Sequence, residues 1–162
     1  MPERAAETDN ILVLGVGNEA LGDEGFGIHV VRKLKENGFP EHIRIEAGGV
    51  AGFDLLGLLS GVDRLIIVDV MVCDLEPGDI GRFNLDAEFK ASGRVPMSFH
   101  ELSVLDLLQI AEVVGLNPRV EFLVTKPVKL EWGFELSPLV QQAADKAVDY
   151  LVKELAGTIS ES

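Results

Sequence analysis

Three side chains in this sequence have the types and positions needed to hold a divalent metal ion. Glu24 lies in a glycine-rich loop, Asp69 ends the most apolar run of the chain, and His100 precedes a helix-like segment. Two carboxylates and one imidazole suit a divalent transition ion whose other positions are filled by water or substrate. A structural zinc site would be closed by four ligands. The imidazole must be neutral to bind, so the affinity should weaken below about pH 6.

Each of these residue types also has an ordinary structural explanation. An Asp after a strand often caps the following turn, and a lone His before a helix is more often a capping or surface residue. His29, on a predicted helix, and His42, in a predicted loop, fit such roles. Cys73 has no cysteine partner in the chain and is expected to pack as a small side chain. Trp132 is expected to cover a loop.

The glycine-rich loop at residues 15–27 has a second interpretation, as a phosphate-binding turn. Its Gly15-x-Gly17-x-x-Ala20 pattern fits a loose form of the dinucleotide fingerprint. The loop also carries three carboxylates, at Glu19, Asp23 and Glu24. These would repel phosphate, and the following helix is predicted to begin too late, near Asp23. Nucleotide binding is therefore the weaker hypothesis.

Alternating strand-like and helix-like runs predict an α/β fold. The expected strands are 11–16, 43–45, 64–70, 80–89 and 120–124, with 80–89 exposed or at an edge. The expected helices are 26–34, 53–59, 102–114 and a last helix opened by Ser137 as N-cap and Pro138. This order implies a three-layer sandwich, a mainly parallel twisted five-stranded sheet with helices on both faces. We expect one domain over residues 1–162, with flexible tails at 1–10 and 157–162.

The expected topology places the candidate metal ligands together. Ligands of such folds bind outside the carboxyl ends of the strands, where the strand order reverses. If the first strand lies between the second and third, this crevice forms after Gly17 and around Asp69. The loops carrying Glu24 and His100 then open at the same edge of the sheet.

Composition limits the partners. The chain has 27 acidic and 14 basic side chains, a net charge of −13, and its 47% hydrophobic content excludes disorder. The negative charge argues against nucleic acid and anionic membrane surfaces as partners. The apolar runs are too short to span a bilayer. The first ten residues do not resemble a secretory signal, so we expect the cytoplasm.

Four segments of the chain resemble the hydrogenase maturation endopeptidases. They are ILVLGVGNEALGDEGFG (11–27), LIIVDV (65–70), MSFHELS (97–103) and KPVKLEWGFELSPLV (126–140). The first is the most specific, because a G-x-G-N opening, an Asp-Glu pair and a trailing G-x-G occur together. The resemblance runs from about residue 11 to residue 155. It implies an endopeptidase that removes the C-terminal extension of a nickel-iron hydrogenase large-subunit precursor once nickel has been inserted.

The resemblance also implies roles for individual residues. The family contacts nickel through an acidic residue of the first loop, an Asp ending the third strand and a His before the third helix. In this sequence these are Glu24, Asp69 and His100. The nickel is expected to belong to the precursor, although other divalent ions can occupy such a site. Glu24 or Asp69 is the candidate general base for attack by water, and the expected supporting loop residues are Gly15, Gly17, Asn18 and Asp23.

Two positions depart from the family pattern. The usual Asp-Gly-Gly-Thr after the second strand reads Ala47-Gly48-Gly49-Val50 here, with Glu46 one place earlier, and Glu101 stands where Gln is common. A one-residue shift in a strand turns a side chain to the opposite face, so Glu46 is a poor substitute for the missing Asp. A module that binds nickel or the precursor without cleaving it is therefore an alternative.

Overall fold

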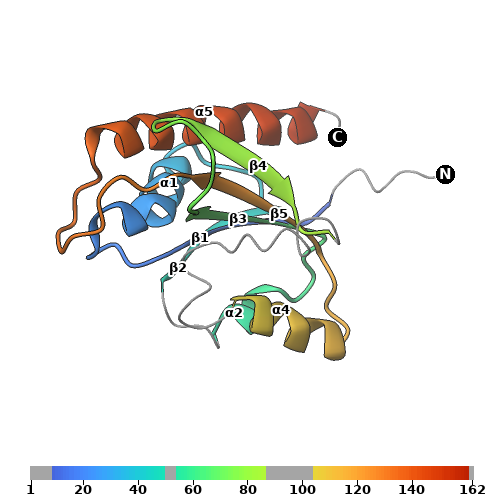
Figure 1. The fold of residues 1–162 in the computed structure, drawn as a ribbon. Helices are drawn as coiled ribbons and strands as arrows, with labels where there is room; N and C mark the ends of the chain where they lie inside the picture. The colour runs from blue at the N-terminus through green and yellow to red at the C-terminus, as the bar shows by residue number, and fades with distance from the viewer. Residues whose placement is uncertain (1–8, 50–53, 87–103, 161–162) are drawn as a thin grey trace.

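A five-stranded sheet forms the middle layer of the molecule (Figure 1). The computed structural model describes residues 9–49, 54–86 and 104–160. The strand order is β2-β1-β3-β5-β4. The strands are β1 (Ile11–Val16), β2 (Ile43–Gly49), β3 (Arg64–Val70), β4 (Ile80–Asn84) and β5 (Arg119–Thr125). All neighbours pair in parallel except β4, which is antiparallel to β5 at the sheet edge, so the predicted fold class is confirmed.

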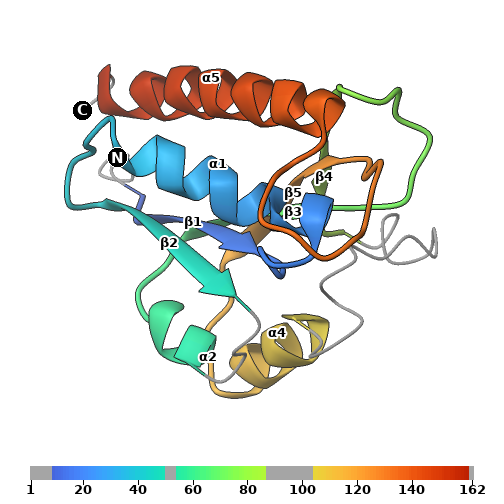
Figure 2. The ribbon, with the colours of Figure 1, turned by 90° about the vertical axis from the view of Figure 1, so that its left-hand side faces the viewer.

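Helices cover both faces of this sheet (Figures 1 and 2). On one face lie α1 (Phe26–Lys35) and α5 (Pro138–Ser160), and on the other lie α2 (Asp54–Leu58) and α4 (Val104–Val113). A short 3₁₀ helix, η2 (Gly22–Gly25), joins β1 to α1. In the described part of the chain, no helix is both long and apolar enough to span a membrane.

The two central strands are buried on both faces, which explains why their sequences are continuously apolar. Every residue of β1 and β3 is buried. Alternate side chains enter different cores. The core under α1 and α5 takes Ile11, Val13, Ile66, Val68 and Val70. The core under α2 and α4 takes Leu12, Leu14, Val16, Leu65 and Ile67.

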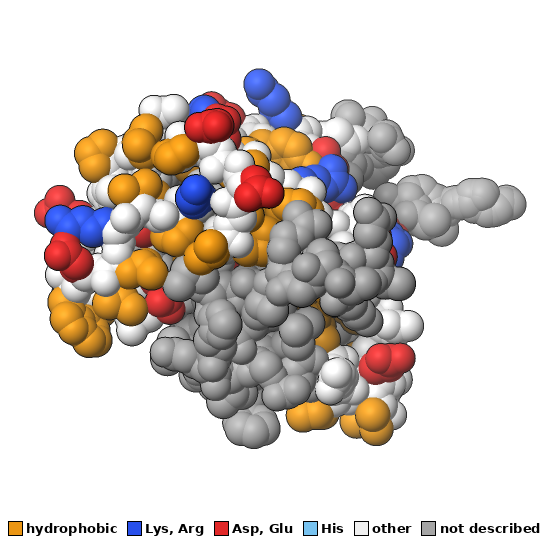
Figure 3. All heavy atoms as spheres, in the orientation of Figure 1, with side chains coloured by type: hydrophobic (Ala, Val, Ile, Leu, Met, Phe, Trp, Pro, Cys, Tyr) orange, Lys and Arg blue, Asp and Glu red, His pale blue; other side chains and the backbone are white. Residues whose placement is uncertain are grey.

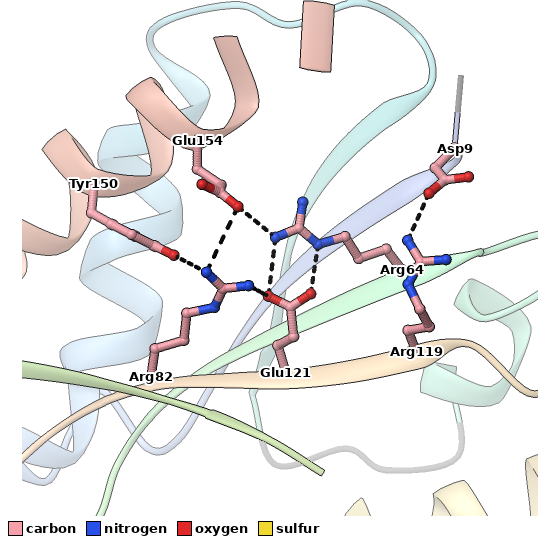
Figure 4. A network of polar contacts seen from close by, with 7 residues as sticks. All are labelled: Asp9, Arg64, Arg82, Arg119, Glu121, Tyr150 and Glu154. Carbon is pink, nitrogen blue, oxygen red and sulfur yellow. Dashed lines mark hydrogen bonds and ion pairs between the residues drawn. The ribbon is translucent and has the colours of Figure 1, made fainter. Parts of the chain in front are cut away.

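The amino-terminal end of the sheet carries a network of charges centred on the buried pair Arg64 and Glu121 (Figure 4). Arg64 donates two hydrogen bonds to Glu121, at 2.6 and 3.0 Å, and one to Glu154 at 2.9 Å. Arg82 pairs with the same Glu121 carboxylate at 2.8 Å and donates to Tyr150 at 2.7 Å. Burial is the largest single influence and raises the pKa of the Glu121 carboxyl, but the hydrogen bonds and positive charges of Arg64 and Arg82 together outweigh it and lower the pKa. These ion pairs and hydrogen bonds therefore link β3, β4, β5 and α5.

Several element bounds differ from their predictions. β2 continues beyond Ile45 to Gly49, and β4 ends at Asn84 rather than near residue 89, with residues 87–89 outside the described part. α5 includes residues 157–160, which were expected to belong to a flexible tail. Ser137 precedes α5 as predicted, but its hydroxyl donates to Asp23 at 2.8 Å. The hydroxyl of Ser137 is thus bonded to a residue more than a hundred positions earlier in the sequence.

Candidate functional site

The strand order reverses where it was expected to. β1 lies between β2 and β3. The connection that leaves β1 therefore leads toward one edge of the sheet, and the connection that leaves β3 leads toward the other edge. The loop that follows β1 contains Glu24, and Asp69 is the penultimate residue of β3. The carboxyl end of this strand pair is therefore the candidate site.

Asp69 is fully buried at this end of β3. Its Oδ1 accepts a hydrogen bond from the backbone N–H of Val70 at 2.8 Å. Because side chains alternate along a strand, Asp69 shares the face of Ile67, which α2 and α4 cover. α4 begins at Val104, four positions after His100 in the sequence. Burial of a carboxylate requires compensating partners, and Asp69 has further interactions within the chain.

Glu24 lies in η2 and is only 8% exposed. This short helix contacts β3, the strand that carries Asp69. Glycine makes the close approach possible, since a Cβ on Gly27 would collide with the carbonyl oxygens of Val16 and Val68. The start of α1 is thereby held against the ends of both strands. Glu24, like Asp69, interacts with other groups of the chain.

Asp23 sits beside Glu24 in the sequence but has a different role. It is fully buried, and its Oδ2 accepts hydrogen bonds from the backbone N–H groups of Val128 and Lys129, at 2.9 and 2.7 Å. Ser137 donates to it twice, from its N–H at 2.7 Å and from its hydroxyl at 2.8 Å. This carboxylate therefore ties η2 to the segment between β5 and α5.

The third carboxylate of the loop, Glu19, faces another direction. It forms an ion pair with Arg32 of α1 at 2.6 Å. The hydrogen bond from Arg32 lowers the pKa of Glu19. The structure thus gives different surroundings to three acids that crowd together in the sequence, and Glu24 is buried in η2, the helix that contacts the strand carrying Asp69.

The first loop does not have the form of a dinucleotide-binding turn. Gly17 has a φ of 130°, and Asn18 folds the chain by accepting a hydrogen bond from the N–H of Ala20 at 3.0 Å. α1 begins only at Phe26. The helix N-terminus that would cradle a phosphate therefore does not follow the glycines directly, which agrees with the sequence-based argument against nucleotide binding.

The position of the missing family Asp lies in a hollow. Ala47 is exposed and, with Gly17 and Asn18, helps line a depression of about 340 Å³ beside the first loop. Glu46 instead faces α1, where it pairs with Lys35 at 3.9 Å. The acid one place earlier therefore does not replace an Asp at Ala47.

Other predictions have mixed outcomes. His100 lies outside the described residues, and within residues 9–49, 54–86 and 104–160 no three His, Cys, Asp or Glu residues cluster as metal ligands would. Cys73 packs partly against the core under α2 and α4, as expected. The prediction for Trp132 is wrong, because its side chain is largely exposed on its loop. His29 has a contact that the sequence did not indicate, a 3.2 Å hydrogen bond between its Nε2 and the carbonyl of Phe134.

Known proteins are similar to this chain in sequence and in fold over nearly its whole length. The family model described as hydrogenase maturation protease matches residues 28–154. The chain belongs to the hydrogenase maturation protease family. The hydrogenase expression/formation protein HupD of Bradyrhizobium diazoefficiens is 32% identical over 155 residues, covering 94% of this chain and 81% of that protein. The hydrogenase 2 maturation protease of Escherichia coli is 33% identical, covering 90% of each chain.

A solved structure of the family agrees with these matches. The hydrogenase maturating endopeptidase HybD from Escherichia coli superposes with a TM-score of 0.79 at 33% identity, covering 92% of this chain and 93% of that one. Membership of the maturation protease family supports a hydrolase that acts as an endopeptidase in hydrogenase maturation. Asp69 and His100 lie inside the residues matched by the family model, whereas Glu24 precedes them.

Proposed function

We propose that this chain removes the C-terminal extension of a nickel-iron hydrogenase large-subunit precursor after nickel insertion. Nickel arrives as part of the substrate, and Glu24, Asp69 and His100 contact it. One observation carries the proposal. In a maturation protease, two carboxylates, Asp69 fully buried and Glu24 nearly so, lie at the carboxyl ends of β1 and β3.

Recognition through nickel would make metal loading a condition for cleavage. Three protein ligands leave coordination positions for groups of the precursor itself. A precursor without nickel would lack the shared ion and bind weakly. The chain would thus cleave only precursors that have received their metal.

The same two carboxylates supply the chemistry of hydrolysis. Docking on nickel places the scissile peptide bond beside Glu24 or Asp69, one of which takes a proton from the attacking water. The water oxygen bonds to the carbonyl carbon, the C–N bond breaks, and the leaving amine takes up the proton. Positioning of the peptide by the bound ion lowers the entropic part of the barrier.

A second candidate, a module that binds without cleaving, rests on the exposed Ala47. No carboxylate stands at that position, and Glu46 is turned toward Lys35. If an acid at this place were needed for hydrolysis, the chain would hold the nickel-loaded precursor intact. Cleavage of the precursor separates the two candidates.

The test compares cleavage of a nickel-loaded precursor by the wild type and by Glu24→Gln, Asp69→Asn and His100→Ala. We expect each change to slow cleavage by at least about a hundredfold, the usual contribution of a proton-transferring or positioning group. Glu36→Gln and His42→Ala are the matched controls, because Glu36 is exposed at the end of α1 and His42 lies in the loop before β2. Full activity in all three site variants would refute the assigned residues. Tight binding without cleavage by the wild type would favour the second candidate.

A further inference from the structure

The segment between β5 and α5, residues 126–137, carries apolar side chains at alternate positions that the fold leaves uncovered. Val128, Leu130, Trp132 and Phe134 are 52%, 39%, 80% and 67% exposed. Figure 3 shows hydrophobic side chains among charged ones at the left-hand end of the molecule, where Figure 1 places this loop. Single exposed apolar residues are common, but four within seven positions, including two aromatic residues that line one hollow, indicate an interaction surface.

This loop is fixed by its backbone, not by burial of its side chains. The N–H of Gly22 donates to the carbonyl of Gly133 at 2.9 Å, and the N–H of Gly133 donates to Ala20 at 2.8 Å. The four hydrogen bonds to Asp23 hold its two ends. The aromatic side chains are therefore presented on an ordered scaffold, which reduces the entropy that a partner would have to overcome on binding.

The loop is continuous with the candidate site. It is bonded to both sides of η2, the short helix that carries Glu24, and Figure 2 shows it curving around that helix. Trp132 and Phe134, together with Asp23, line a hollow of about 380 Å³. Residues 126–137 are thus hydrogen-bonded neighbours of the helix that carries Glu24, and a protein whose metal reaches Glu24 would approach this loop.

We propose that residues 126–137 form a docking loop for apolar side chains of the hydrogenase precursor that lie beside its nickel site. This inference rests on the proposed function. Charge favours the precursor over a second copy of this chain as the occupant. The loop itself carries Lys126 and Lys129 as well as Glu131 and Glu135, and Lys129 pairs with Glu131 at 3.1 Å, but two whole chains of net charge −13 would repel each other on approach. A basic precursor surface would instead be attracted by the net negative charge of the whole chain.

The test is the double variant Trp132→Ser/Phe134→Ser, assayed by cleavage of the nickel-loaded precursor. We expect KM to rise at least about tenfold, because exposed aromatic anchors dominate binding at interfaces, while kcat stays within about twofold since neither residue contacts the metal in the proposal. Val113→Ser is the matched control, an exposed apolar residue (86%) on α4 at the opposite face, and its KM should be unchanged. An unchanged KM in the double variant would overturn the docking loop while leaving the proposed protease intact.

A second readout separates this inference from the proposed function. If the wild type does not cleave, its binding to the nickel-loaded precursor is compared directly with that of the double variant. A tenfold or greater loss of affinity would still support docking, and equal affinity, or no binding by either, would refute it. Sedimentation of the wild type and the double variant, without precursor, tests the other occupant. A dimer that the double variant abolishes would assign the loop to a second copy and overturn the proposal.

Discussion

Replacement of Asp23 by Asn should loosen the docking loop while leaving the sheet folded. The carboxylate accepts three hydrogen bonds at Oδ2 and one, from the N–H of Ser137, at Oδ1. Asn retains one acceptor oxygen, so the best arrangement keeps the three bonds and turns an NH₂ group toward the N–H of Ser137. One bond to a charged acceptor contributes about 1.5–3 kcal/mol. The other three bonds also weaken, because the acceptor is no longer charged. We therefore expect the free energy needed to open the loop to fall by about 2–4 kcal/mol.

Hydrogen exchange of backbone amides measures this opening directly. Each 1.4 kcal/mol changes the equilibrium constant for opening by a factor of ten. Exchange of the amides of Val128, Lys129 and Ser137 should therefore accelerate by roughly 30- to 1,000-fold. Amides of β1 and β3 should change far less, because the loop can open without separating the strands. Cleavage of the precursor should fall through a higher KM, since the docking loop is no longer held.

Glu19→Gln is the matched control for this experiment. Glu19 lies in the same glycine-rich loop, but its carboxylate pairs with Arg32 on the surface, where such pairs contribute under about 1 kcal/mol. It should leave exchange at the three amides unchanged. If Asp23→Asn also left them unchanged, the hydrogen bonds to Asp23 would not be what holds the loop.

Two further changes test other contacts of the fold. Gly22→Ala should destabilise the protein by at least about 2 kcal/mol in urea denaturation, because φ is +54° and a Cβ would lie 2.8 Å from the carbonyl oxygen of Lys129. Gly38→Ala, at φ +68° with open space around it, should cost only about 1 kcal/mol, and equal losses would show that the close approach to Lys129 is unimportant. Glu121→Gln should cost about 3 kcal/mol at neutral pH, because it leaves the buried Arg64 without its main partner. The pKa of Glu121 is lower in the folded chain than its ordinary value of 4.5, so its contribution is present above that pH and is lost as the pH falls through the folded value. The stability difference between wild type and variant should therefore shrink in acid, and a difference independent of pH would contradict this account of Glu121.

The sequence was most informative where burial leaves little choice. The bounds of β1 and β3 match their predictions residue for residue. Both runs are short, rich in branched side chains and buried on two faces. Their continuous apolar pattern fits neither the spacing of an amphipathic helix nor the alternation of a half-exposed strand. The position of β1 between β2 and β3 also matches the expected topology, which led to Asp69 and to the loop with Glu24.

The roles of neighbouring acids were not predictable in the same way. Asp23 and Glu24 are adjacent carboxylates in the sequence, and their different roles depend on which backbone groups fold against them. The groups that bind Asp23 come from residues 128–137, more than a hundred positions later. Trp132, the single tryptophan of the chain, was expected to cover a loop. Its side chain is exposed, and hydrogen bonds to the backbone and to Asp23 hold residues 126–137.

The central claim is that nickel in the precursor licenses cleavage. Its most direct test is the intact mass of the hydrogenase large-subunit precursor after incubation with this chain, with and without nickel loaded. We predict that a C-terminal peptide is lost from the nickel-loaded precursor and not from the nickel-free form. Equal cleavage of both forms would contradict recognition through nickel, and an unchanged mass in both, with loading verified, would contradict the proposed protease.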